Sequence, residues 1–113
     1  MKKLTLFLLV SLSSPSIFSA ECTQSGCIST ISTLYTNTEG LVYVGTPEDE
    51  TKAECTPVSG TFFTLNTDAK NSDKVYSSLL AAYVSGKVIQ LRIKENSNNC
   101  ELAYVRFDSS YGN

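Results

Sequence analysis

The side chains with the clearest chemistry in this chain are its four cysteines, Cys22, Cys27, Cys55 and Cys100. An even number of cysteines in a small exported domain indicates disulfides. We favour the pairs Cys22–Cys27, which closes a short loop containing Gly26, and Cys55–Cys100, which ties the middle of the chain to its last strand; pairing of Cys22 or Cys27 with a distant cysteine stays open. Metal ligation is disfavoured, because no spacing is Cys-x-x-Cys and the chain has no histidine.

Catalytic chemistry finds little support among the other side chains. Without histidine the chain lacks the usual general base of serine and cysteine hydrolases. Ser85 and Lys87 are the residue types of a serine nucleophile and its lysine base. However, Ser, Gly and Lys at this spacing are typical of a helix end. Two carboxylate pairs have the spacing of solvated loop charges: Asp68 with Asp73, and Glu95 with Glu101. We therefore predict a protein that is not an enzyme and that needs no metal or cofactor.

Ligand binding without catalysis is the remaining use for the polar and aromatic side chains. An exposed tyrosine beside amide side chains is a common way to hold a sugar or a peptide. The candidate ligand-binding residues are Tyr35, Asn37, Asn96, Asn98 and Asn99. The simpler interpretation, that these residues belong to ordinary polar turns, competes with this one.

The first twenty residues have the composition of a secretory signal. Lys2 and Lys3 precede an apolar run, Leu4 to Val10, and small residues lead up to Ala20. This run is shorter than a membrane span requires. We therefore predict a signal peptide over residues 1–20 and a periplasmic or extracellular product.

The remaining chain, residues 21–113, is the size of a single domain. Removal of Lys2 and Lys3 lowers the basic residues from 9 to 7 against 11 acidic residues, so the net charge becomes −4. This charge disfavours binding to nucleic acid or to an anionic membrane. Four acidic residues cluster in one segment, which we interpret as a solvated loop: Glu48, Asp49, Glu50 and Glu54.

Hydrophobic periodicity predicts three strands, a helix and two further strands. The expected strands cover residues 28–36, 41–44, 53–65 with an interruption near Pro57 and Gly60, 87–94 and 100–107, and the expected helix covers 73–85. Gly86 is placed to end the helix, and the candidates for its first cap are Asp68, Ser72 and Asp73. We expect Phe63, Tyr83 and Phe107 in the core and a frayed tail over residues 108–113.

This order, β-β-β-α-β-β, matches the five-stranded, partly open OB barrel. We therefore predict a mainly β, disulfide-stapled OB-like domain with one α-helix. In OB folds the loops between strands one and two and between strands four and five often flank the ligand. These loops correspond here to residues 37–40 and 95–99.

Several segments resemble a widespread set of small exported bacterial proteins. They are Ile28, Gly40 to Val44, Cys55, Tyr76 to Lys87, Leu91 to Ile93 and Cys100. In that set the two later cysteines recur, which implies a Cys55–Cys100 bridge. The set is in turn distantly similar to the OB-like pentameric B subunits of subtilase-type cytotoxins, which bind cell-surface glycans. This chain is shorter and has no tryptophan, so the resemblance implies an architecture and no particular site.

Together these observations predict an exported, non-enzymatic binding protein, a recognition subunit whose ligand is a glycan or another protein. The alternative is a periplasmic inhibitor or accessory factor that caps an enzyme. Oligomerisation is compatible with either function.

Overall fold

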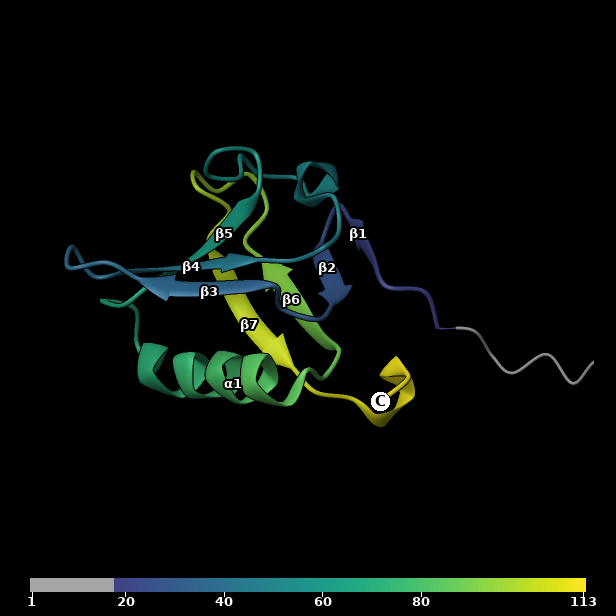
Figure 1. Cartoon of the computed structure of the whole chain (residues 1–113). Coiled ribbons are helices and arrows are strands. Elements are labelled where there is room, and N and C mark those ends of the chain that lie inside the picture. Colours follow the sequence, from purple (N-terminus) through teal and green to yellow (C-terminus); the bar gives the residue numbers. More distant parts are fainter. Residues whose placement is uncertain (1–17) are drawn as a thin grey trace, which may run out of the picture.

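The computed structural model describes residues 18–113, and Figure 1 shows small β-sheets beside one long helix. The predicted signal peptide falls largely on residues 1–17, outside the described residues. In chain order the elements are β1 (Glu21–Thr23), β2 (Gly26–Ser29), β3 (Thr33–Thr36), β4 (Leu41–Gly45), the 3-10 helix η1 (Glu50–Lys52), β5 (Phe62–Asn66), α1 (Ser72–Ser85), β6 (Ile89–Ile93), β7 (Leu102–Arg106) and the 3-10 helix η2 (Ser109–Tyr111). The predicted class, mainly β with one α-helix, is confirmed. Over these residues no helix has both the length and the apolar character needed to cross a bilayer.

The strands form two sheets in place of the single five-stranded barrel that we expected. One sheet has four strands in the order β1-β2-β6-β7, and the other has three in the order β3-β4-β5. All neighbouring strands are antiparallel. Isolated parallel bridges between Thr56 and Asn98 and between Thr64 and Glu101 connect β5 and the chain before it to the segment that leads into β7. The two sheets therefore meet at isolated contacts and not along a continuous ladder.

The segment predicted as one first strand, residues 28–36, is divided between the sheets. Its first part belongs to β2, which pairs with β6, and its last part is β3, which pairs with β4. Residues 30–32 lie outside both strands, and the Ser32 amide donates to the carbonyl of Gly45 at 2.8 Å. The uneven alternation of this segment reflects a chain that leaves one sheet and enters the other. The predicted hairpin with residues 41–44 is confirmed as β3 and β4.

The predicted third strand starts later than expected, because a tight turn occupies its first half. Ser59 and Gly60 have φ angles of 55° and 72°, and the Val58 and Phe62 backbones donate to each other at 3.0 Å. Such a turn cannot continue an extended ladder. The regular strand therefore begins only at Phe62, and η1 precedes the turn.

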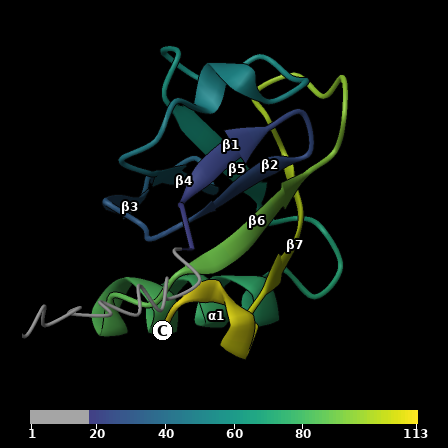
Figure 2. The ribbon, with the colours of Figure 1, turned by 90° about the vertical axis from the view of Figure 1, so that its right-hand side faces the viewer.

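Helix α1 lies along the end of the molecule opposite η1 in both views (Figures 1 and 2). Its predicted end is confirmed, since Gly86 takes the left-handed conformation with a φ of 67°. Its N-cap is Asn71, with a φ of 63° and no side-chain cap bond, so none of the three expected residues serves as the cap. The helix packs against β3, β5 and β7.

One residue of α1 that we expected in the core is exposed. Leu79 and Ala82 are fully buried, whereas Tyr83 is 46% exposed and does not belong to the core as expected. Leu79 and Ala82 are three positions apart and share the face that meets the sheets. Tyr83 follows Ala82 directly, and the helical rotation of about 100° per residue carries its side chain toward the solvent edge of this face. Phe63 is fully buried as predicted, at the centre of β5.

The last two strands confirm one pattern and correct another. Ile89, Leu91 and Ile93 alternate inward along β6 with at most 1% exposure, as predicted. β7 pairs with β6 through a register shift, and its buried residue is Leu102. Phe107, expected in the core, is 44% exposed because it lies beyond the last pair of the ladder.

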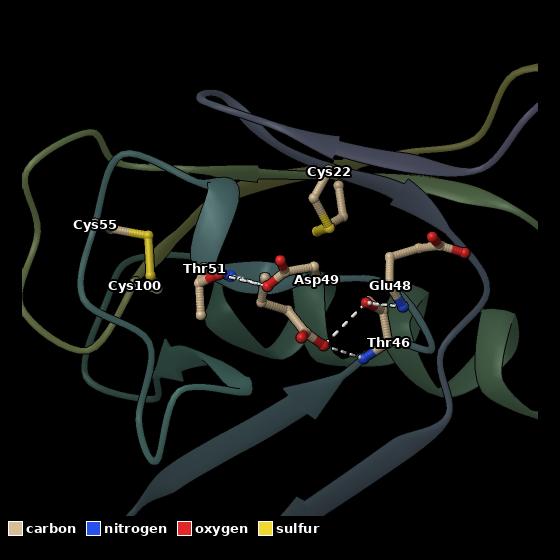
Figure 3. Close-up of a disulfide and its surroundings, with 9 residues drawn as sticks. Cys22, Thr46, Glu48, Asp49, Thr51, Cys55 and Cys100 are labelled. Carbon is tan, nitrogen blue, oxygen red and sulfur yellow. Dashed lines mark hydrogen bonds between the residues drawn. A yellow bond between two sulfur atoms is a disulfide. The ribbon is translucent and has the colours of Figure 1, made fainter.

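Both favoured disulfides are confirmed, and all four cysteines are paired. Cys22 and Cys27 are direct cross-strand partners in β1 and β2. Cys55 and Cys100 join the loop after η1 to the start of the last strand segment, across a sequence separation of 45 (Figure 3). These bonds are consistent with an oxidising compartment outside the cytoplasm.

We expected the acidic segment to be a solvated loop, but one of its carboxylates is buried. Glu50 is only 3% exposed, and its Oε1 accepts hydrogen bonds from the Thr46 amide at 2.7 Å and from the Thr46 hydroxyl at 2.9 Å. Asp49 caps η1 by accepting from the Thr51 amide (Figure 3). These carboxylates hold the chain path between β4 and β5.

The tail is ordered, in contrast to the predicted fraying. Tyr111 is 8% exposed, and its ring lies 5.7 Å from that of Phe18. The Asn113 side chain accepts from the Val88 amide at 2.8 Å and donates to the Val88 carbonyl at 3.0 Å. The Asn113 side chain thus makes the two hydrogen bonds to Val88 that a neighbouring strand would make, directly before β6.

Candidate functional site

The candidate site lies on the outer face of the three-stranded sheet. Tyr35 on β3 pairs with Tyr43 on β4, and Tyr43 pairs with Thr64 on β5. Direct partners in antiparallel strands share a face, as do residues two apart along one strand, so Phe62 joins them. The opposite face of the same sheet points into the core.

Three of these residues form what we call the aromatic cluster: Tyr35, Tyr43 and Phe62. The rings of Tyr35 and Tyr43 are stacked, with centroids 4.6 Å apart and an angle of 11° between the ring planes. Phe62 presents its edge to both, at 5.7 Å from Tyr35 and 6.2 Å from Tyr43. Tyr35 is 44% exposed, whereas Tyr43 and Phe62 are half-buried, so the cluster meets solvent mainly through Tyr35.

Gly45 leaves room for this arrangement. It stands opposite Phe62 in the ladder, and a Cβ at Gly45 would approach the Phe62 ring to 3.2 Å. A larger residue there would push the Phe62 ring aside, since contacts at this distance are tighter than packing tolerates. The sequence thus provides the ring with a backbone surface to lie against.

Asn37 holds the hairpin at one side of the aromatic cluster. Its Oδ1 accepts from the amides of Glu39 at 3.0 Å and Leu41 at 3.2 Å, which closes the turn between β3 and β4. Its Nδ2 donates to the hydroxyl of Tyr43 at 3.4 Å. Asn37 therefore orients a ring of the cluster while its own polar atoms are largely used within the protein.

The second predicted loop, residues 95–99, borders the sheet at β5. The Thr64 hydroxyl donates to the Asn99 carbonyl at 2.9 Å, and the Thr64 amide donates to the Cys100 carbonyl at 3.0 Å. The Asn96 amide donates to the Glu54 carbonyl at 2.7 Å. These bonds fix the loop backbone close to the same strand that carries Phe62.

The three asparagines of this loop occupy turns and a backbone bridge of their own. Asn96 and Asn99 take left-handed conformations, with φ angles of 61° and 64°, and Asn98 forms the bridge to Thr56. Asn96, Asn98 and Asn99 are exposed. Within residues 18–113 no hydrogen bond joins Tyr35 or Asn37 to this loop. The structure thus groups Tyr35 with Asn37 and places the three loop asparagines beyond Thr64.

Sequence reasoning missed Phe62 and did not select Tyr43. A signal for Tyr43 was present, because Tyr35 and Tyr43 stand equally far from Glu39 in the turn and must therefore face each other in a hairpin. Phe62 could not be found in this way, because the turn before β5 hides the register of that strand.

The ionisable groups with shifted pKa values lie in capping turns and not beside the aromatic cluster. Hydrogen bonds from Ser110, followed by one from Arg106, lower the pKa of Asp108 to about 2 from 3.8. Hydrogen bonds from Thr51 lower the pKa of Asp49. Each carboxylate caps a 3-10 helix, so each shift has a structural cause.

Three of the side chains considered for catalysis have ordinary structural partners. Ser85 donates to the helix carbonyl of Ala82 at 3.4 Å. Glu95 pairs with Arg92 at 3.2 Å and Glu101 pairs with Lys94 at 3.1 Å. Over residues 18–113 no group of three or more cysteine, aspartate and glutamate side chains is arranged to hold a metal ion.

Comparison with protein-family models, curated proteins and solved structures finds no match to this chain. The function must therefore be argued from the residues and their geometry.

Proposed function

We propose that this protein is an exported, non-enzymatic binding protein that recognises a glycan through the aromatic cluster. The observation that supports this most is the stacked Tyr35–Tyr43 pair, which Phe62 contacts from the side and whose Tyr35 is 44% exposed. An exposed aromatic face gives the apolar face of a sugar ring a surface on which to pack. The exposed amides of the 95–99 loop can both donate and accept, as sugar hydroxyls require.

The architecture we propose is OB-like. The bridge between Thr64 and Glu101 is parallel, and it links the strand before the helix to the last strand segment. Together with the pairs β2–β6, β3–β4, β4–β5 and β6–β7, this contact makes a circuit in which β2 and β3 act as one bent first strand. The aromatic cluster then spans strands one, two and three, with Tyr43 and Phe62 on the two strands whose face binds oligosaccharides in OB domains.

Glycan-array binding by the oxidised protein tests the proposal, with Tyr35→Ala as the disrupting variant. Tyr104→Ala is the matched control, because Tyr104 is also 44% exposed but lies on β7. We expect Y35A to weaken binding roughly 3- to 10-fold, the range of one aromatic contact, and Y104A to leave binding unchanged. A flat array, or equal effects of the two variants, would contradict glycan recognition by this face.

A second candidate function, inhibition or assistance of a partner enzyme, is favoured by a different surface. The outer side of α1 exposes Leu80 at 44%, Tyr83 at 46% and Val84 at 77%. Contiguous exposed apolar side chains are typical of protein-binding surfaces. Retrieval of one enzyme from a periplasmic extract by the wild type, and loss of that enzyme with Val84→Glu, would support this function over glycan binding.

A further inference from the structure

A cleft lies on the opposite side of the β3–β4 hairpin from the aromatic cluster. It measures about 420 Å³ and lies between α1 and the core-facing side of the three-stranded sheet, and its lining consists of Thr36, Val42, Thr67, Ser72, Asp73 and Tyr76. Thr36 and Val42 are direct partners in the hairpin, so they share the face opposite to Tyr35 and Tyr43. The volume falls within the range of small-molecule sites, about 300–1,000 Å³.

The lining is mostly apolar in its depth and polar at its edge. Val42 is 2% exposed and belongs to the core, and Tyr76 packs against that core from the helix. Two of the hydroxyl groups are already used, since Thr67 donates to the Gly40 carbonyl and Ser72 donates to the Thr67 carbonyl. The cleft therefore offers an apolar body with few polar groups free to select a ligand.

Asp73 is the charged side chain of this lining. Among the described residues no ion pair or hydrogen bond occupies its carboxylate. An ionised carboxylate only accepts hydrogen bonds, so it selects a donor and prefers a cation. The chain is also acidic overall, which favours the approach of a positively charged molecule.

We infer that this cleft binds a small cationic amphiphile, an aromatic ring or short alkyl chain that bears a protonated amine. The apolar group packs against Val42 and Tyr76, and the amine lies at the Asp73 carboxylate. This site is separate from the proposed glycan face, because the two lie on opposite sides of the hairpin. Either can therefore fail without the other.

An NMR titration of the ¹⁵N-labelled, oxidised protein with phenethylamine, 2-phenylethanol and phenylacetate tests the inference. The three probes share an apolar ring and differ in charge. We expect phenethylamine to shift the amide signals of Thr36, Val42, Thr67 and Tyr76, and to bind more tightly than 2-phenylethanol, with phenylacetate weakest. Shifts confined to other parts of the protein, or equal affinity for amine and carboxylate, would overturn the inference.

Variants separate the charge from the cavity. Asp73→Asn should weaken phenethylamine about threefold, the size of an exposed charge interaction, and leave 2-phenylethanol unchanged. Thr36→Phe should reduce binding of both probes by filling the cleft, with the circular dichroism spectrum showing that the fold is retained. Tyr35→Ala, on the other face, should change neither. Unchanged phenethylamine affinity in D73N would contradict the role of Asp73.

Discussion

The amide of Thr64 donates a hydrogen bond to the carbonyl of Cys100 at 3.0 Å, which joins the three-stranded sheet to a half-cystine of the other half of the molecule. Cys100 is in turn bonded to Cys55, in the loop that precedes β5. Cys100 thus connects β5 and the loop before it to the 95–99 loop that leads into β7.

Replacement of Cys55 and Cys100 together by serine should lower the free energy of unfolding by about 4 kcal/mol, because the bond closes a long loop in the unfolded chain. The Cys22–Cys27 bond closes a much shorter loop, so its replacement by two serines should cost about 2 kcal/mol. Urea unfolding of the two double variants and the wild type measures the difference. Equal losses would show that loop length does not govern these bonds.

Gly26→Ala should prevent correct pairing of β2 with β6. A Cβ at Gly26 would lie 2.0 Å from the Leu91 carbonyl oxygen, and its φ of 130° is strained for any other residue. Gly60→Ala is the control, since Gly60 also has a positive φ, of 72°, but no atom lies within 4 Å of a Cβ there. We expect G60A to cost about 1–2 kcal/mol and G26A clearly more, as measured by urea unfolding. Similar losses in the two variants would show that the positive φ angle, and not the contact with Leu91, determines the loss of stability at Gly26.

Glu50→Ala should destabilise the fold by about 1.5–3 kcal/mol, the range for hydrogen bonds to a charged group. The change leaves the buried amide and hydroxyl of Thr46 without their acceptor. Glu54→Ala is the matched control, because Glu54 belongs to the same acidic segment but has an exposed side chain. Thermal unfolding at neutral pH compares the two. A loss in E54A as large as that in E50A would contradict this role.

Asp108 should make the free energy of unfolding decrease at low pH. Its pKa is lowered in the folded state to about 2 from the ordinary 3.8, so the folded state favours the ionised form. The resulting contribution is complete above pH 3.8 and is lost as the pH falls through about 2. The melting temperature of Asp108→Asn should therefore fall less over this interval than that of the wild type. The effect is small, because Asp108 is exposed to solvent screening.

Local sequence patterns correctly predicted the strand β6 and the end of the helix. The alternation of Ile89, Leu91 and Ile93 defines β6, and Gly86 ends the helix where a left-handed residue is needed. The disulfides followed from which parts of the chain had to be tied together. The strand and the helix end are decided by neighbouring residues, whereas the cysteine pairing was a preference among the three connectivities that four cysteines allow.

Apart from the Cys55–Cys100 bond, the features that depend on contacts distant in sequence were missed. The division of residues 28–36 between two sheets depends on partners in β4 and β6. The order of the tail depends on the contact of Asn113 with Val88. The burial of Glu50 was missed although its partner Thr46 is nearby in sequence, because a charged side chain in an acidic segment indicates a solvated position. For the candidate site, Tyr35 was found by its type, whereas Phe62 required the register of β5. The patterns of single segments carry no information about these partners.

The Cys55–Cys100 bond fastens one margin of the proposed glycan site, whereas the hairpin that carries Tyr35 and Tyr43 contains no cysteine. A thiol reductant would therefore loosen the asparagine loop first and leave the stacked rings in place. If the protein binds a glycan as proposed, its selectivity would then change before binding is lost.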